Sequence, residues 1–99
     1  MESVPDSTER VKFILGSYNV GPGHVFDAQR LAEKYGADPS IWDDNVAKYL
    51  LLKSQAKYFN DPVVKSGYAR GREPVNYVSE ILDRYGKYSS LIKESIAGL

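Results

Sequence analysis

Few side chains in this sequence could do acid–base or metal chemistry. The chain holds one histidine, His24, and no cysteine, so a zinc site built from those ligands is not expected. Asp43 and Asp44 form the only close acidic pair, and a solvated helix face is the ordinary interpretation of such a pair. His24 stands at an expected helix start, where the helix dipole disfavours a protonated ring. It is therefore a candidate general base or, more simply, a helix cap or cleft-edge residue.

Two glycine-rich segments precede expected helices and have the general shape of a phosphate-binding loop: GPGH at 21–24 and GYARGREP at 67–74. Neither follows a strand, and neither matches a nucleotide-binding fingerprint. We therefore predict no cofactor and no metal for this chain.

The segment GSYNVGPGH, residues 16–24, ends a helical pattern on a tyrosine and an asparagine. The apolar spacing before it is that of one helix face: Val11, Ile14, Leu15 and Tyr18. Tyr18 is thus expected on the apolar face in the last turn, with Asn19 at the end of the helix and Gly21 where the chain must turn. Composition alone favours a core tyrosine and an asparagine helix cap.

Length and charge limit the classes of protein. The 99 residues fit one small domain, and 13 basic residues balance 13 acidic ones. That balance argues against nucleic acid as a partner, and no apolar run approaches the length of a membrane span. The first ten residues are neither basic nor apolar, so they do not form a signal peptide. We expect Met1 to have been added to a fragment of a longer chain.

The pattern predicts an all-α fold with about five helices. Asp6 and Glu9 have capping-box spacing at the start of the first helix. The second helix is expected to begin near Gly23 or His24, and ADPSIW, residues 37–42, is expected to open the third, with Asp38 as its cap. A break near Ser54 should leave a short helix through residues 58–59.

A final strong helix is expected to open at Glu73-Pro74, with Gly86 ending or kinking it. The apolar faces of the later helices are predicted as Val25, Ala28, Ala32 and Tyr35, then Trp42, Val46, Tyr49 and Leu50, then Val75, Val78, Leu82 and Tyr85. The predicted organisation is a linker-like stretch over 1–6, a helical region over 7–86 and a helical tail over 87–99.

Two ordered segments resemble a known family. SYNVGPGHV, residues 17–25, resembles the Ala-Tyr-Asn motif of the goose-type-lysozyme-like lytic transglycosylases, which cleave peptidoglycan. GYARGREPVNYVSEI, residues 67–81, resembles their downstream motif, in which Arg-Gly-x-Glu precedes a helix carrying Tyr-Val-x-x-Ile. The joining segment, 27–59, is most similar to the membrane-bound lytic transglycosylase F branch. The resemblance runs from about residue 10 to residue 85, and Ser17 stands where the family usually has alanine.

The resemblance implies a lysozyme-like helical domain and three substrate-binding residues. Tyr18 would stand in the cleft with its hydroxyl near the catalytic glutamic acid. Asn19 would shape the cleft floor, and Tyr77 would face the same cleft.

The resemblance also implies three residues with structural roles. Gly21 would allow the turn, while Arg70 and Glu73 would hold the loop and the helix start together. His24 would have no assigned chemistry.

The family's reaction needs one glutamic acid, which first protonates the glycosidic oxygen and then acts as base on the muramic acid 6-hydroxyl. In the family, this residue precedes the Tyr-Asn motif on an earlier helix, and nothing before Tyr18 matches. We therefore interpret the chain as the C-terminal portion of a catalytic domain, with no catalytic residue of its own and inactive alone.

The partners implied are peptidoglycan strands and the remainder of the catalytic domain upstream. Self-association is a further possibility, because apolar surface would be left exposed. A periplasmic or cell-envelope location follows from the resemblance alone.

Three alternatives stay open at this stage. A goose-type lysozyme-like hydrolase would use the same cleft and differ in its product. A non-catalytic glycan-binding module would keep the cleft and lack the acid. A helical interaction domain would carry both motifs by coincidence.

Overall fold

The computed structural model describes the backbone of residues 4–97 and the side chains of residues 4–86. Six elements follow one another: α1 (Ser7–Val20), α2 (Pro22–Lys34), η1 (Trp42–Val46), α3 (Ala47–Leu52), α4 (Ala56–Phe59) and α5 (Arg72–Ala97). No strand occurs in this part of the chain, so the prediction of an all-α fold is confirmed. The expectation about Met1 and the side chains of the 87–99 tail lie outside the described residues.

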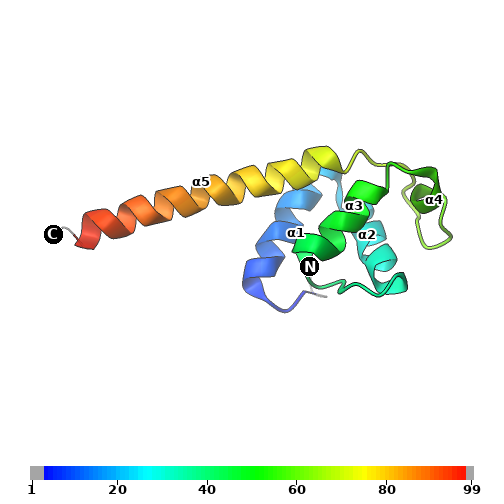
Figure 1. The fold of residues 1–99 in the computed structure, drawn as a ribbon, viewed down its shortest axis with the longest axis horizontal. Coiled ribbons are helices and arrows are strands. Elements are labelled where there is room, and N and C mark those ends of the chain that lie inside the picture. Colours follow the sequence, from blue (N-terminus) through cyan, green and yellow to red (C-terminus); the bar gives the residue numbers. More distant parts are fainter. Residues whose placement is uncertain (1–3, 98–99) are drawn as a thin grey trace.

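The helices form a small bundle from which one helix projects. Helix α1 packs against α2 and α5, and α3 packs against α2, η1 and α5. The first half of α5 crosses this bundle, its second half extends beyond it, and α4 lies at the opposite end (Figure 1). The loop between α4 and α5 connects that end of the bundle to the start of α5.

Helix α1 begins as predicted but presents a different face to the core. The carboxylate of Asp6 accepts a hydrogen bond from the backbone N–H of Glu9, at 3.0 Å, and caps the helix. Phe13 is its buried apolar side chain, whereas Tyr18 is 82% exposed. The prediction that Tyr18 lies on a core-facing side is therefore wrong. The spacing correctly predicted a helix, but the core covers the side of α1 that carries Phe13 and Gly16, not the side that carries Tyr18.

Helix α2 follows after a single residue. It begins at Pro22, one position before the expected start, and proline fits a first helical turn because its missing N–H has no intrahelical partner there. Val25, Ala28 and Ala32 are fully buried, as predicted. Tyr35 follows the last helical residue and is partly exposed.

The expected helix start at Asp38 is wrong. Asp38 instead closes a turn, because its carboxylate accepts hydrogen bonds from the N–H and the hydroxyl of Ser40. Inside η1, Asp43 is extended and Asp44 has a left-handed φ of 60°. Regular helix is therefore delayed until α3. The chain leaves that helix at Leu52, so the expected break near Ser54 is confirmed.

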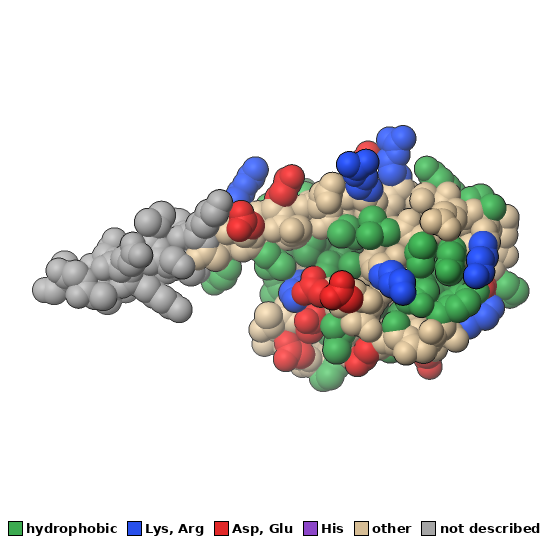
Figure 2. Space-filling model, in the orientation of Figure 1, with side chains coloured by type: hydrophobic (Ala, Val, Ile, Leu, Met, Phe, Trp, Pro, Cys, Tyr) green, Lys and Arg blue, Asp and Glu red, His purple; other side chains and the backbone are tan. Residues whose placement is uncertain are grey.

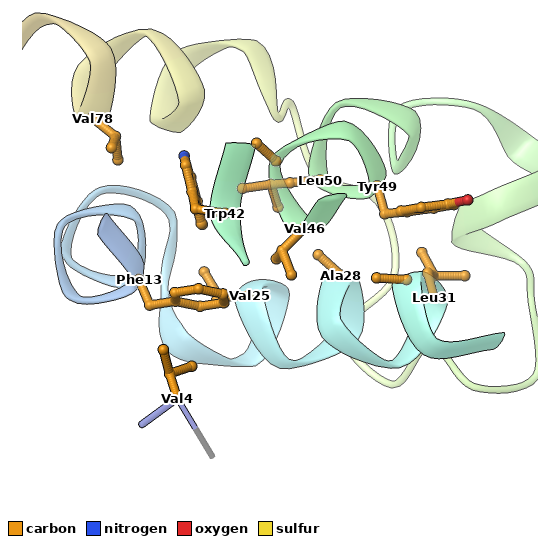
Figure 3. Close-up of a cluster of buried hydrophobic side chains, with 12 residues drawn as sticks. Val4, Phe13, Val25, Ala28, Leu31, Trp42, Val46, Tyr49, Leu50 and Val78 are labelled. Carbon is orange, nitrogen blue, oxygen red and sulfur yellow. The ribbon is translucent and has the colours of Figure 1, made fainter. Parts of the chain in front are cut away.

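The core lies where α1, α2, α3 and α5 meet around one tryptophan (Figure 3). Trp42 is 2% exposed and meets the ring of Phe13 edge-on, with ring centroids 5.4 Å apart. The predicted buried face of residues 42–50 is confirmed: Trp42, Val46, Tyr49 and Leu50. Val4, from the segment before α1, is also fully buried.

Helix α5 is amphipathic over its described side chains. Val78 is buried, Val75 and Leu82 are half-buried, and Tyr85 is mostly exposed. Gly86 does not end the helix, contrary to one of the two expectations for it, since α5 continues to Ala97. Among the described helices, none has the length and apolar character needed to cross a membrane.

Candidate functional site

The two motif segments meet at a pair of tyrosines. Tyr18 lies in the last full turn of α1, and Tyr77 lies in the second turn of α5. Their ring centroids are 6.3 Å apart, with 27° between the ring planes, so the rings are stacked. Tyr77 is half-buried, whereas Tyr18 is exposed. The fold thus brings together, at the surface, two aromatic rings that are far apart in the sequence.

Asn19 and Gly21 complete this end of α1. Asn19 is exposed, so its amide is available to solvent or to a ligand. Gly21 has φ 103° and ψ 141°, a conformation that side-chain-bearing residues rarely adopt. Its N–H donates to the carbonyl of Ser17 at 2.8 Å, which closes α1 before the chain turns into α2.

Arg70 and Glu73 lie together at the start of α5. Their charged groups are 3.5 Å apart, and the two side chains are 73% and 67% exposed. An ion pair this exposed contributes little to stability, because water screens it. The stronger ties of the loop that precedes α5 lie elsewhere.

The sequence reasoning missed a fully buried carboxylate, Asp27 of α2. It accepts hydrogen bonds from the ammonium of Lys53 at 2.7 Å, from the N–H groups of Lys65 and Ser66 at 2.8 Å each, and from the guanidinium of Arg30. Burial alone would raise the pKa of Asp27, but these donors outweigh burial and lower the pKa to about 2. Asp27 is therefore a charged anchor for the loop between α4 and α5.

Lys53 and His24 complete this buried cluster. Lys53, the residue after α3, is 0% exposed, and its Nζ lies 2.8 Å from Nδ1 of His24. Burial lowers the pKa of Lys53, while its hydrogen bond to Asp27 opposes that change. Burial and then the charge of Lys53 lower the pKa of His24 below the ordinary value of 6.5. His24 is thus half-buried in a polar cluster with Lys53 and Asp27.

The same side of α2 binds the loop at two more places. The Nε of Arg30 donates to the carbonyl of Val63 at 2.9 Å. Lys34 and the hydroxyl of Tyr35 both donate to the carboxylate of Asp61, at 2.8 to 3.0 Å. The spacing of residues 27, 30 and 34 could have suggested one polar helix face, but the sequence holds no signal for the partners.

Within the described residues, grooves lie on both sides of α5. One, of about 550 Å³, lies between α5 and the η1–α3 segment, and Asp43, Asp44 and Lys48 stand at its edge. The other, of about 610 Å³, lies between α1 and α5 and is lined by Val11, Leu15, Ile81, Leu82, Tyr85 and two hydroxyl residues. Figure 2 shows apolar side chains exposed along the side of α5 that faces the bundle.

The predicted acidic pair does not form a metal site with other ligands. Asp43 is paired with Lys12 at 2.7 Å. Within the described residues, no group of three histidine or acidic side chains is placed to hold a metal ion. Asp43 is thus held in a surface ion pair with Lys12 beside the first groove.

Comparison with known proteins finds relatives of one name, and no family model matches the chain. The chain is 49% identical over 88 residues to a membrane-bound lytic murein transglycosylase F of Shewanella frigidimarina, and the match covers 86% of this chain. Proteins of the same name from Maricaulis maris and Vibrio cholerae are each 48% identical, over 81% and 93% of this chain. The match spans only 17–18% of the length of these curated relatives.

Identity near one half over most of the chain indicates common ancestry, and the helical fold agrees with the resemblance drawn from the two motifs. Over this segment, the chain is therefore homologous to proteins named membrane-bound lytic murein transglycosylase F.

Proposed function

We propose that this chain forms one wall of the glycan-binding cleft of a peptidoglycan-cleaving lytic transglycosylase, with Tyr18, Asn19 and Tyr77 facing the glycan. The observation that carries the proposal is the stacked pair of Tyr18 and Tyr77, which joins both family-like segments at the surface. The names of the relatives support the same activity.

The chemistry of these three side chains suits a sugar chain. An exposed tyrosine offers an apolar ring face to a sugar and a hydroxyl to hydrogen-bond it. The amide of Asn19 can both donate and accept hydrogen bonds. Tyr77, half-buried behind Tyr18, would restrict the orientation of the Tyr18 ring.

The general acid of the reaction is proposed to come from a segment that precedes this one in the longer protein. Glu9, the described glutamate of α1, already has two structural partners. Its carboxylate accepts hydrogen bonds from the backbone N–H of Trp42 at 2.9 Å and from Lys12 at 3.2 Å. The chain alone should therefore release no anhydromuramic product.

The full protein is proposed to work at the cell envelope, in the periplasm, because its relatives are named as membrane-bound.

The apolar groove between α1 and α5 is proposed to be covered by the remainder of the catalytic domain. Val11 is 46% exposed and Tyr85 is 68% exposed, which is costly apolar surface for a small domain. Sedimentation of the chain alone tests this. A concentration-dependent dimer that Leu15→Glu abolishes would instead assign the groove to self-association.

The function is tested by exchanging segments. This chain replaces the matched segment of the Shewanella frigidimarina relative, and the hybrid and the chain alone are each incubated with purified peptidoglycan. We expect soluble products with 1,6-anhydromuramic ends from the hybrid and none from the chain alone. Tyr18→Ala should lower the hybrid's rate by about tenfold, equivalent to roughly 1.4 kcal/mol of lost transition-state stabilisation.

Tyr68→Ala is the matched control. Tyr68 is also exposed, at 55%, but its ring contacts Phe59, so its loss should leave the rate nearly unchanged. Reducing-end products would identify a hydrolase. Binding to peptidoglycan by a folded chain, with a folded but inactive hybrid, would identify a binding module and overturn the enzyme proposal.

A further inference from the structure

The buried cluster of Asp27, Lys53 and His24 connects three parts of the chain. Asp27 and His24 come from α2, Lys53 follows α3, and the N–H groups of Lys65 and Ser66 come from the loop over 60–71. Both oxygens of Asp27 are used, one toward Lys65 and the other toward Lys53 and Ser66. Removing the Asp27 carboxylate would leave the buried ammonium of Lys53 without its carboxylate partner, which is costly.

The same loop sets the position of α5. The N–H of Ala69 donates to the carbonyl of Lys53, so the backbone of Lys53 contacts the loop directly, while its side chain bonds Asp27, which holds the same loop. Gly71 then lies against the backbone of Leu50, and α5 begins at the next residue, Arg72. Because Tyr77 lies in the second turn of α5, the loop's attachment also determines where Tyr77 meets Tyr18.

His24 is the part of this cluster that mild acid can change. Lys53 donates, so Nδ1 of His24 must accept, and the ring must be neutral at that nitrogen. A protonated ring would place an N–H against an ammonium 2.8 Å away and remove the acceptor. The charged groups that face His24 are Lys53 from the end of α3 and Asp27 from its own helix. The loop contributes backbone N–H groups to the cluster, and Arg30 bonds Asp27 from the side.

We propose that Asp27, Lys53 and His24 form an acid-sensitive lock that holds the 60–71 loop, and with it the start of α5, in place. At neutral pH the lock is closed. Protonation of His24 repels Lys53, weakens its bond to Asp27 and releases the N–H groups of Lys65 and Ser66. The lock is a property of the chain itself and does not rest on the proposed function.

Amide hydrogen exchange of the 99-residue chain, corrected for the intrinsic effect of pH, tests the lock. In the released state His24 would have its ordinary pKa of about 6.5, so lowering the pH to about 5 should favour release by up to roughly 30-fold. We expect the protection of the Lys65 and Ser66 amides to fall by about tenfold or more between pH ~7.5 and ~5. The amides of Leu31 and Ala32, in the buried part of α2, should keep their protection.

His24→Asn is the matched variant, because the asparagine oxygen can accept from Lys53 but does not titrate. Its Lys65 and Ser66 amides should stay protected at both pH values. The lock is overturned if the wild-type amides do not change, if the variant loses protection equally, or if Leu31 and Ala32 change to the same extent as the loop.

A second readout serves if the variant fails to fold. His24 is the only histidine, so its ring resonances can be followed without ambiguity. The amide shifts of Lys65 and Ser66 should titrate with the midpoint of the His24 ring, and that midpoint should lie below 6.5. Loop amides that do not follow the ring would contradict the lock.

Discussion

Gly71 lies against the backbone of Leu50, so close that a Cβ at position 71 would be 2.0 Å from the Leu50 carbonyl oxygen and 2.4 Å from its carbon. Only a residue without a side chain fits there, and the obstacle is main chain that cannot rotate away. This contact fixes the loop to α3 immediately before α5 begins.

Gly71→Ala is therefore expected to destabilise the fold by about 3 kcal/mol or more, at the upper end for overpacking. Urea denaturation followed by far-ultraviolet circular dichroism measures this directly. A loss below about 1 kcal/mol would mean that the loop can move away from Leu50 without cost.

Gly86→Ala is the matched glycine substitution and should have the opposite effect. Gly86 lies inside α5, is exposed, and has no atom within 4 Å of where a Cβ would stand. Alanine in an exposed helix interior is about 0.5–1 kcal/mol more stable than glycine. We expect an increase of that size in the free energy of unfolding, from the same denaturation experiment. A decrease would contradict a helix that continues through residue 86.

Ser17→Ala should be neutral or stabilising. The hydroxyl oxygen of Ser17 is buried, and among the described residues it has no hydrogen-bond partner. Burying a hydroxyl without a partner is unfavourable, so removing it should stabilise the chain by up to about 1 kcal/mol. Thermal unfolding of the two proteins measures the change. A loss of stability would reveal a partner that the hydroxyl needs.

Asp27 should make the stability depend on pH in the acid range. Its folded pKa, about 2, lies below the unfolded value of 3.8, so its contribution is present above 3.8 and is lost as the pH falls toward 2. This shift corresponds to about 2 kcal/mol at neutral pH. Asp27→Asn should thus lower the free energy of unfolding by about 1 kcal/mol more near pH 6 than near pH 3.

Urea midpoints at the two pH values test the prediction for Asp27. Glu33→Gln, an exposed carboxylate on the same helix, is the control and should change little at either pH. An equal cost of Asp27→Asn at both pH values would show that the carboxylate's charge does not contribute.

Local patterns in the sequence determined much of the helical framework. Helical spacing and capping chemistry act between near neighbours, so the Asp6 cap, the buried stripe of α2 and the break near Ser54 could be predicted. The buried face around Trp42 followed from the same spacing, although the turn at Asp38 and the backbone of η1 did not. In that segment a side-chain hydrogen bond within the turn replaced the expected helix start.

The arrangement of the helices was decided only by the tertiary structure. A sequence pattern gives the period of a helix face but not which neighbour covers it, and for this reason Tyr18 was placed in the core when it lies at the surface. Tyr18 and Tyr77 were paired by family resemblance, and their stacking depends on how α1 and α5 cross. Asp27 and Lys53 gave no signal, because a buried charge is tolerated only where distant residues supply its partners.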